Sequence, residues 1–459
     1  MKNLNSIMEE TKQKNAFNWG IATSSYQIEG AHNIDGKGPS VWDVFSHTKG
    51  KVKNGDTGDV ACDHYNKFSE DIKLMRDLGV NSYRFSISWP RIFPIGTEQK
   101  VNQKGMDFYD RLVDTLLENE ITPFVTLNHW DMPQGLEDLG GWTNRETVEH
   151  FVKYGHYLSK SLGDRVLDWI THNEPWCISY LGYVGGIKPP GLKNEWAKSL
   201  STAHHLLLSH GKVIPEIRGN SKNSKVGITL NLNTAIPASE SEHDKRACEF
   251  YDAQFNRLYL DPLYNQTYPK LLFDTLMEKK LIKQSDLDFI KKEDHKIIAT
   301  PTDFLGVNYY SRGVVRSDEI EENVNKKQNV DLGPKTDFGW EVYPKGLYDL
   351  MKKLQTKYNV NEIIITENGC SYNDEPDKRK IINDEKRIEY HSSHIEQVQI
   401  AINEGVPCTG YFAWSFMDNF EWAAGYSQRF GLVWVNFETL ERIPKESYYW
   451  YQNFLKSQK

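Results

Sequence analysis

The segment Ile363-Ile364-Ile365-Thr366-Glu367-Asn368-Gly369 is a short apolar run that ends in a carboxylate and a glycine. The segment Trp169-Ile170-Thr171-His172-Asn173-Glu174-Pro175 likewise places a glutamate after an apolar run. Such runs are typical of buried strands, and a carboxylate at the mouth of a buried strand is costly to desolvate without partners. Taken singly, each glutamate fits a salt-bridged structural residue, but two in the same setting favour a shared function.

Eight β-rich runs alternate with longer amphipathic stretches along the chain. The runs lie near residues 19–26, 80–89, 121–130, 167–174, 226–231, 304–310, 363–367 and 410–414, and the helical patterns cover 68–78, 107–117, 148–162, 197–214, 346–358 and 384–403. This order is expected of repeated βα units on a parallel sheet. No Ser-rich or Pro-rich linker divides the chain, so we predict an α/β fold in which residues 1–459 form a single catalytic (β/α)8 TIM barrel domain, with extended βα loops around an active-site pocket. Residues 1–15 are expected to be a flexible or peripheral segment.

Polar and aromatic side chains recur at the ends of these runs. They are Gln27, His129, Asn173, Glu174, Asn308, Tyr310, Glu367 and Trp414. In an eight-stranded α/β barrel the C-terminal ends of the strands carry the active-site loops, and packing alone would not repeat this placement so often. We therefore expect these side chains to meet at one mouth of the barrel.

Composition argues against several other classes of function. The formal net charge of -8 disfavours a nucleic-acid partner. No signal peptide or membrane span is recognisable, so no membrane partner and a cytoplasmic location are expected. Five scattered cysteines without a CxxC motif predict buried free thiols. His204, His205 and His210 lack the HExxH register, and we expect no metal and no cofactor.

A pair of carboxylates at one barrel mouth fits the hydrolysis of a glycosidic bond. One carboxyl must protonate the leaving oxygen, while the second stabilises or traps the oxocarbenium-like centre. A separation of about 5–5.5 Å gives a covalent intermediate and retention, whereas roughly 6.5–9.5 Å leaves room for water and gives inversion. Spacing along the sequence does not decide between these outcomes.

Seven motifs, in order, resemble those of glycoside hydrolase family 1 and specifically of its β-glucosidases: TSSYQIEGA, RFSISWPRIFP, TLNHWDMPQ, ITHNEP, GVNYYS, ITENG and YFAWSFMDNFEWAAGYSQRFGL. The similarity extends over nearly the whole chain. It implies a (β/α)8 barrel with retaining chemistry, in which Glu174 is the acid/base and Glu367 is the nucleophile. On this reading a charged Glu367 keeps a proton on Glu174, and glycosylation of Glu367 removes that charge so that Glu174 can act as a base.

The resemblance also implies a set of supporting residues. Arg84 pairs with the nucleophile, Tyr310 donates a further hydrogen bond to it, and Asn173 binds the sugar 2-hydroxyl. The other positions expected to bind the sugar are Gln27, His129, Asn308, Trp414, Glu421 and Trp422, with Trp414 as the floor under the pyranose ring. The alternative for such a His or Trp is a packed core residue, and for Arg84 an internal ion pair.

The residue at position 421 distinguishes family members that act on phosphorylated sugars from those that act on unphosphorylated ones. Relatives that act on 6-phosphorylated glycosides carry Ser there, with Lys and Tyr seven and nine positions later, where this chain has Gln428 and Phe430. A carboxylate repels a phosphate dianion, and no lysine stands at position 428 to receive it, so an unphosphorylated sugar is expected. Glu174 implies an O-glycosidase, because thioglucosidases of the family lack this acid.

Two segments fit the pattern less well. The polar stretch 312–343 suits a solvated surface loop or, alternatively, a rim over the active site with Trp340 as a platform for the leaving group. Lys188-Pro189-Pro190-Gly191 stands where many relatives read His-Ala-Pro-Gly, and Asn436 stands where Asp is frequent. Contacts near the entrance are therefore not carried over from the family.

These observations predict an O-glycoside hydrolase, a retaining β-glucosidase that removes terminal non-reducing β-D-glucosyl residues from small β-glucosides and oligosaccharides. The alternatives are a broader β-glycosidase acting on β-galactosides or β-fucosides, a transglycosidase, and a carbohydrate-binding pseudoenzyme. The presence of both glutamates argues against the last. The expected partner is a small-molecule β-glycoside, and the oligomeric state, the aglycone and the linkage stay open.

Overall fold

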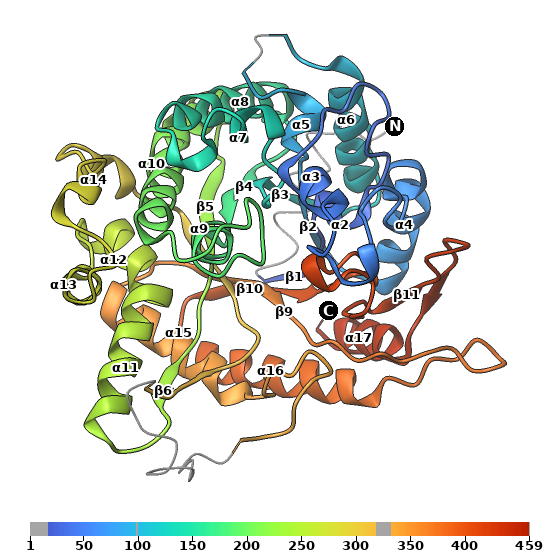
Figure 1. The fold of residues 1–459 in the computed structure, drawn as a ribbon. Coiled ribbons are helices and arrows are strands. Elements are labelled where there is room, and N and C mark those ends of the chain that lie inside the picture. The colour runs from blue at the N-terminus through green and yellow to red at the C-terminus, as the bar shows by residue number, and fades with distance from the viewer. Residues whose placement is uncertain (1–16, 98–99, 318–331, 459) are drawn as a thin grey trace.

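Eight parallel strands close into a barrel at the centre of the molecule (Figure 1). The computed structural model describes residues 17–97, 100–317 and 332–458, so the predicted N-terminal segment 1–15 lies outside the described residues. Around the barrel the strand order is β1-β10-β9-β7-β5-β4-β3-β2. The bounds are β1 Asn18–Ala22, β2 Ser82–Ser86, β3 Thr122–Asn128, β4 Asp168–Asn173, β5 Lys225–Asn231, β7 Phe304–Asn308, β9 Ile363–Asn368 and β10 Cys408–Trp414. Each predicted run overlaps one of these strands, and the (β/α)8 barrel is confirmed.

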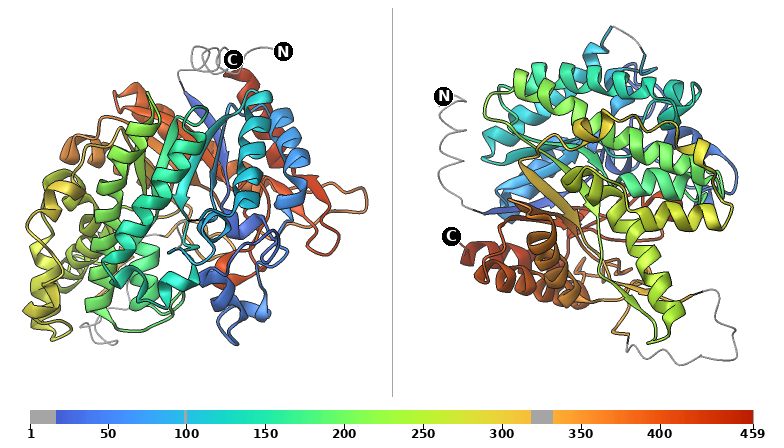
Figure 2. Two further views of the ribbon diagram at one scale, coloured as in Figure 1. Left: turned by 90° about the horizontal axis from the view of Figure 1, so that it is seen from above. Right: turned by 90° about the vertical axis from the view of Figure 1, so that its left-hand side faces the viewer.

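Helices lie outside the barrel, as both views of Figure 2 show. The helices that the sequence pattern predicted are α4 His64–Leu78, α6 Gln103–Glu118, α8 Glu146–Leu162, α10 Trp196–Asn220, α15 Pro344–Tyr358 and α16 Glu385–Asn403. Helices that we did not predict include α9 Pro175–Tyr183, α11 Glu242–Asp252, α12 Leu258–Asn265, α13 Lys270–Glu278, α14 Asp294–Ile298 and α17 Glu446–Ser457. The predicted strands 19–26 and 80–89 extend too far. Tyr26 lies in the short helix α2 Ser25–Ile28, and Trp89 lies in the short helix α5 Trp89–Ile92.

Helix α4 shows how local sequence sets these elements. Its buried apolar side chains include Ile72, Met75 and Leu78, which share one face at the three- to four-residue spacing of a helix. The helix ends at Gly79, whose φ of 90° is left-handed and favours glycine. The Gly79 N–H donates to the carbonyl oxygens of Met75 and Arg76 and so caps the last turn.

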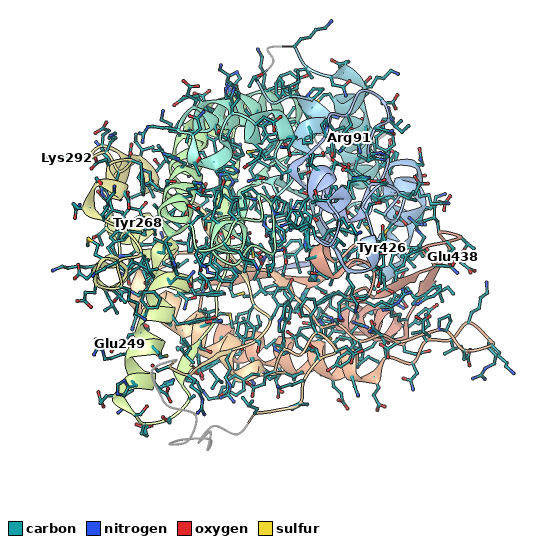
Figure 3. All side chains as sticks on the ribbon, viewed as in Figure 1. Arg91, Glu249, Tyr268, Lys292, Tyr426 and Glu438 are labelled. Atoms are coloured by element: carbon teal, nitrogen blue, oxygen red, sulfur yellow. The ribbon has the colours of Figure 1, made fainter. Side chains whose placement is uncertain are left out.

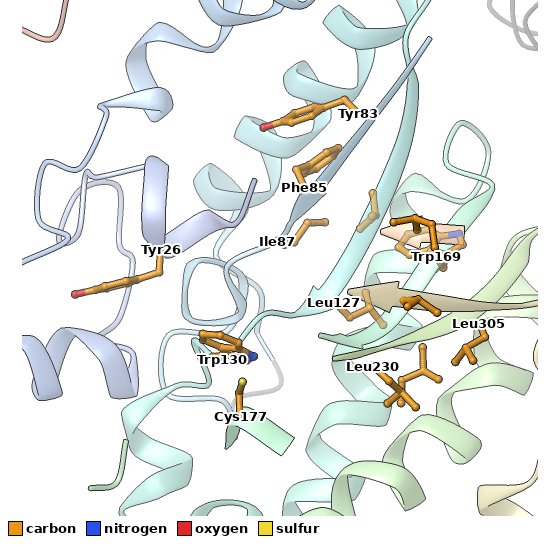
Figure 4. Packing of buried hydrophobic residues seen from close by; sticks show 14 of the residues in the cluster. Tyr26, Tyr83, Phe85, Ile87, Leu127, Trp130, Trp169, Cys177, Leu230 and Leu305 are labelled. Carbon is orange, nitrogen blue, oxygen red and sulfur yellow. The ribbon is translucent and has the colours of Figure 1, made fainter. Parts of the chain in front are cut away.

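Strand residues alternate between two apolar clusters, because successive side chains of a strand point to opposite faces. The cluster between the strands and the helices includes Leu127, Trp169, Leu230 and Leu305 (Figure 4). The second cluster comprises Ala22, Phe124, Ile170, Phe304, Ile364, Phe412, Trp414 and Phe430. Within it, the ring centroids of Phe124 on β3 and Phe412 on β10 lie 5.0 Å apart, although β2 and β1 stand between their strands. The barrel interior is therefore filled by side chains, as is usual for this fold.

Two small sheets lie outside the barrel. Strand β6 Ala235–Pro237 pairs parallel with β8 Gly313–Val315, and β11 Val433–Val435 pairs antiparallel with β12 Arg442–Pro444. Strand β8 begins the polar segment 312–343, whose residues 318–331 lie outside the described part of the chain. Where the chain returns, the rings of Phe338 and Trp340 each lie 6.1 Å from that of Phe430. The described part of this segment therefore packs against the barrel, which favours the rim over a wholly solvated loop.

Side chains fill the space between barrel and helices, and exposed charged residues such as Glu249, Lys292 and Glu438 lie at the periphery (Figure 3). All five cysteines are free and buried, as predicted. Among the residues that the structure describes, no helix has the length and apolar character needed to cross a membrane.

Candidate active site

Strand pairing brings the predicted residues to one level of the barrel. Ala22 at the end of β1 pairs with Arg84 on one side and with Trp414 on the other. Asn308 at the end of β7 pairs with Glu367 on β9. These positions meet because parallel strands carry their C-terminal ends to the same rim.

Glu367 is buried and held by two donors. Arg84 donates from Nη1 to Glu367 Oε1 at 2.5 Å, and the Tyr310 hydroxyl donates to Oε2 at 2.6 Å. Burial raises the pKa of Glu367, and the nearby charge of Glu174 raises it further, whereas Arg84 and Tyr310 act in the opposite direction. Burial and the charge of Glu367 also raise the pKa of the Tyr310 phenol, which therefore remains a donor.

Glu174 follows β4 and accepts hydrogen bonds from neutral groups. Asn308 Nδ2 donates to Oε1 at 2.7 Å, and the Cys177 thiol donates to Oε2 at 3.1 Å. Thr366 Oγ1 donates to Asn308 Oδ1 at 2.8 Å, which turns the amide nitrogen of Asn308 towards Glu174. Glu174 itself has a left-handed backbone with a φ of 48°. Such conformations are unfavourable for non-glycine residues and gather at functional sites.

Asn173 connects the hydrogen-bond partners of the two glutamates. Its Oδ1 accepts from Arg84 Nη2 at 2.6 Å and from Asn308 Nδ2 at 3.1 Å. Arg84 also contacts Glu367, and Asn308 also contacts Glu174, so one network of side chains positions both carboxylates. Both glutamates face the same cavity.

This cavity has a volume of about 610 Å³, which suits a small ligand. Of the predicted residues, those that line it are His129, Glu174, Asn308, Tyr310, Trp340, Glu367, Trp414, Glu421 and Trp422. Gln27, Arg84 and Asn173 do not line it, but each hydrogen-bonds to a residue that does. These three residues therefore lie behind the residues that line the cavity and hold them by hydrogen bonds.

One end of the cavity combines hydrogen-bonding groups with flat rings. The ring of His129 lies 5.9 Å from those of Trp414 and Trp422 and nearly parallel to both. His129 Nε2 lies 3.1 Å from the amide nitrogen of Asn173, so the imidazole accepts there. Its Nδ1 is a buried nitrogen without a hydrogen-bond partner in the described chain and is free to donate to a ligand. Burial lowers the pKa of His129 well below its usual value, and Arg84 and Lys188 add to this, so the ring is neutral.

Glu421 stands at the same end. Gln27 Nε2 approaches Glu421 Oε2 at 3.5 Å and also donates to the Phe420 carbonyl oxygen at 2.9 Å. Burial raises the pKa of Glu421 to about 7, the charges of Glu367 and Glu174 add to the shift, and Lys188 opposes it. This end therefore offers acceptors, donors and ring faces together, as a polyhydroxylated ring requires.

Comparison with known proteins agrees with this architecture. The profile of Glycosyl hydrolase family 1 matches residues 9–459. Beta-glucosidase A from Acetivibrio thermocellus is 48% identical over 443 residues, which are 96% of this chain and 97% of that protein. Beta-glucosidase A from Thermotoga maritima is 47% identical over 452 residues, which are 98% of this chain and 99% of that protein. The chain belongs to glycosyl hydrolase family 1.

A solved structure of a family 1 member superposes closely. The beta-glucosidase from Thermotoga maritima in complex with glucoimidazole has a TM-score of 0.89 and 46% sequence identity, and the match covers 96% of this chain and 98% of that one. The barrel and its loops are thus arranged as in that family 1 enzyme.

Two clusters of aromatic side chains contribute to the lining of the family 1 cavity. On one side Trp176 and Tyr251 pack against Phe255, with ring centroids 4.6 Å and 5.2 Å away. On the other side Trp340 lies 4.4 Å from Phe338 and 5.2 Å from Tyr310. Aromatic rings in the lining suit the flat face of a sugar or an aryl group.

Several residues that line the cavity were not predicted as site residues, and among them are Trp130, Trp176, Cys177 and Lys188. Trp130 follows His129, and Trp176 and Cys177 follow Glu174 and Pro175, so adjacency to a predicted residue was the available signal. Lys188 was noticed only as a departure from the family pattern near the entrance. Instead, it is 9% exposed and lies against three tryptophan rings.

Proposed function

We propose that this chain is a retaining β-glucosidase that hydrolyses terminal non-reducing β-D-glucosyl residues of small β-glucosides and oligosaccharides. Glu174 is the acid/base and Glu367 is the nucleophile. The observation that supports this most strongly is the asymmetry of the two carboxylates in one cavity. Glu367 faces a guanidinium and a phenol, while the side-chain donors to Glu174 among the described residues are the neutral groups of Asn308 and Cys177.

The first step requires one charged and one protonated carboxyl. Because two buried carboxylates repel each other, the pair retains a proton more readily than isolated groups do. Arg84 stabilises the negative charge on Glu367, so the proton resides on Glu174. Glu367 then attacks the anomeric carbon while Glu174 passes its proton to the glycosidic oxygen, and the bond from carbon to the leaving oxygen breaks.

The second step reverses the role of Glu174. Esterification removes the charge of Glu367, and Glu174 is left as a carboxylate after giving up its proton. It accepts a proton from water, whose oxygen attacks the anomeric carbon and breaks the ester bond to Glu367. Two inversions at one carbon return the β-anomer.

The remaining predicted residues are proposed to bind the sugar. His129, Glu421 and Trp422 contact its hydroxyls, Trp414 supports the ring, and Asn308 acts close to the reacting carbon. Gln27 and Asn173 contribute through the lining residues Glu421 and His129, to which they hydrogen-bond. Trp340 is proposed as a platform for the leaving group, since it lines the cavity and packs against Phe338. We also propose that the chain is a single catalytic domain, because the strands of one closed barrel supply these residues or the loops that carry them.

A small-molecule β-glycoside is the proposed partner, with neither nucleic acid nor membrane involved. The cytoplasmic location stays a prediction, and the five free thiols are consistent with a reducing compartment.

Replacement of the nucleophile tests the proposal. Glu367→Gly should lower turnover of an aryl β-glucoside at least about a thousandfold, because no covalent intermediate can form. Added azide should restore turnover of a dinitrophenyl β-glucoside and give the α-glucosyl azide, since the anion fills the space left by the carboxylate. Glu362→Gly is a matched control, because Glu362 precedes β9 at the opposite end of the strand and pairs with Lys225 at 2.8 Å.

Nuclear magnetic resonance of the first sugar released by the wild-type enzyme tests retention directly. β-Glucose should appear before mutarotation produces the α-anomer. Initial release of α-glucose, or full activity of Glu367→Gly without azide, would contradict the proposed mechanism.

A further inference from the structure

Lys188 is a buried lysine that faces the cavity, where burial lowers the pKa of its side chain and the charge of Glu421 opposes that shift. Its residue is 9% exposed, and it lines the cavity together with Glu421 and Trp422. Its ammonium nitrogen lies 3.6 Å from the ring centroid of Trp130, 5.2 Å from that of Trp422 and 5.6 Å from that of Trp42. We call Trp42, Trp130 and Trp422 the tryptophan cage.

The tryptophan cage does not replace the hydrogen bonds to water that the ammonium group loses on burial. Ring faces attract a cation, but they accept no conventional hydrogen bond from its three N–H groups. In the described parts of the chain, no oxygen forms a hydrogen bond or an ion pair with the Lys188 ammonium. Buried charges are normally paired, because desolvation is costly. The ammonium therefore has donors to offer to whatever occupies the cavity.

The loop that carries Lys188 is fixed to helix α9. The N–H groups of Ile187 and Lys188 both donate to the Leu181 carbonyl oxygen, at 3.0 Å and 3.3 Å. A side chain at Gly182 would meet the Pro189 carbonyl oxygen at 2.4 Å, so glycine lets the loop pack directly on the helix. Lys188 is thus held in place by backbone contacts and not by a partner for its charge.

The cage is joined to the proposed reaction centre. Trp130 Nε1 donates to the Asn173 carbonyl oxygen at 2.8 Å, and its ring lies 4.5 Å from that of Trp422. Trp422 follows Glu421 in the chain, and the charge of Lys188 acts on that carboxylate. Figure 4 shows Trp130 close to Cys177, which contacts Glu174. The ammonium therefore stands on the side of the cavity where the sugar is proposed to bind.

We propose that Lys188 is a further substrate-binding residue, whose ammonium donates a hydrogen bond to a neutral glycone oxygen beside Glu421. Lys188 and Glu421 then form a donor and acceptor pair of opposite charge. Such a pair recognises a hydroxyl group and leaves no net charge to attract a phosphate or carboxylate. This inference rests on the proposed β-glucosidase function and adds a residue that recognises the glycone by a hydrogen bond.

Lys188→Met removes the charge and keeps most of the length of the side chain. KM should rise roughly tenfold or more for both p-nitrophenyl β-glucoside and cellobiose, because a hydrogen bond from a charged donor to the shared glycone is lost. The value of kcat should change less than about threefold if the contact is made equally in the ground and transition states. Lys193→Met is the matched control, since Lys193 is an exposed lysine of the same loop.

Stability separates this role from a structural one. If the ammonium lacks a partner until substrate binds, Lys188→Met should melt at the same temperature as the wild type or higher. A purely structural lysine would instead lower the melting temperature when removed. Lys188→Gln, which keeps an N–H donor, should recover part of the lost affinity.

Three results would overturn the inference. One is an unchanged KM in both variants of Lys188 while the wild type is active. Another is a KM increase confined to cellobiose, which would place the contact on the aglycone. The third is a wild type that prefers 6-phospho-β-glucosides and loses that preference in Lys188→Met, because the ammonium would then bind an anion.

Failure of the proposed function is distinguishable from failure of this inference. A wild type inactive on every glucoside would contradict the function. Calorimetric binding of glucoimidazole to the wild type and to Lys188→Met needs no turnover, and equal affinity of the two proteins would still reject Lys188 as a glycone contact.

Discussion

Arg84 and Glu367 form a hydrogen-bonded ion pair at 2.5 Å, although β1 and β10 stand between their strands in the barrel. Both side chains are buried, and the contact reaches across the inside of the barrel mouth. A guanidinium in this place stabilises a negative charge that burial and Glu174 oppose. The pair therefore controls whether the proposed nucleophile is ionised.

The pH dependence of the wild-type enzyme should reflect this balance. The pKa of Glu367 is raised, and the reaction needs its ionised form. Activity should therefore be lost as pH falls, and the acid limb of kcat/KM should lie at a higher pH than for an ordinary glutamate. A pH profile of kcat/KM on an aryl β-glucoside measures this, and an acid limb at or below the usual glutamate range would contradict it.

Arg84→Met should shift that limb further. Loss of the guanidinium removes an interaction that lowers the pKa of Glu367, so the acid limb should move to higher pH. The ionised nucleophile also loses the cation that stabilises it, so kcat/KM should fall about a hundredfold or more. Arg76→Met is the control, because Arg76 is 55% exposed on α4 and should leave the profile unchanged. An unshifted limb would show that Arg84 does not set the charge of Glu367.

Glu174→Gln should affect substrates according to their leaving groups. A poor leaving group such as the sugar of cellobiose needs the proton, so cleavage should slow by about 10²–10⁴-fold. Formation of the glycosyl-enzyme from a dinitrophenyl glucoside should be far less affected, because dinitrophenolate departs without protonation. Pre-steady-state release of the phenolate measures that step. An equal loss for both substrates would argue against an acid role.

Glu421→Ser should weaken recognition of the unphosphorylated sugar. The carboxylate is proposed to accept hydrogen bonds from sugar hydroxyls, so kcat/KM on p-nitrophenyl β-glucoside should fall roughly tenfold to a hundredfold. The wild type should cleave the 6-phosphoglucoside poorly, because Glu421 repels its dianion. Rates on this pair of substrates test both statements, and dominant cleavage of the phosphorylated one by the wild type would refute this role.

Asp131, which is not one of the proposed catalytic residues, should make the folding stability depend on pH. It is buried, it accepts from the Ser25 hydroxyl at 2.7 Å, and burial raises its pKa to about 7 from 3.8. A raised acid pKa gives stability that is present below the unfolded value and is lost as pH rises through the folded value. Relative to Asp131→Asn, the wild type should therefore lose stability between about pH 4 and pH 7. Melting temperatures at pH 5 and pH 7.5 measure this difference, and parallel values for the two proteins would contradict it.

The local pattern was a good guide to the elements but not to their limits. Tyr26 and Trp89 fell within predicted strands, yet they lie in the short helices α2 and α5. The helices between β5 and β7 were missed because they are short, with 11, 8, 9 and 5 residues in α11 to α14, so each displays few turns of a helical pattern. The location of the segment around Trp340 could not be predicted, because a polar sequence is compatible both with a solvated loop and with a loop that packs against the barrel.

The sequence alone determined the order of strands and helices, the two glutamates at strand ends, and the family motifs around them. These features depend on short-range periodicity, which a single segment carries by itself. The tertiary structure alone decided that Arg84 reaches Glu367, that Asn308 turns towards Glu174, and that Lys188 enters the cavity. Such contacts join residues far apart in the chain, and they exist only once the closed barrel brings the ends of its strands to one rim.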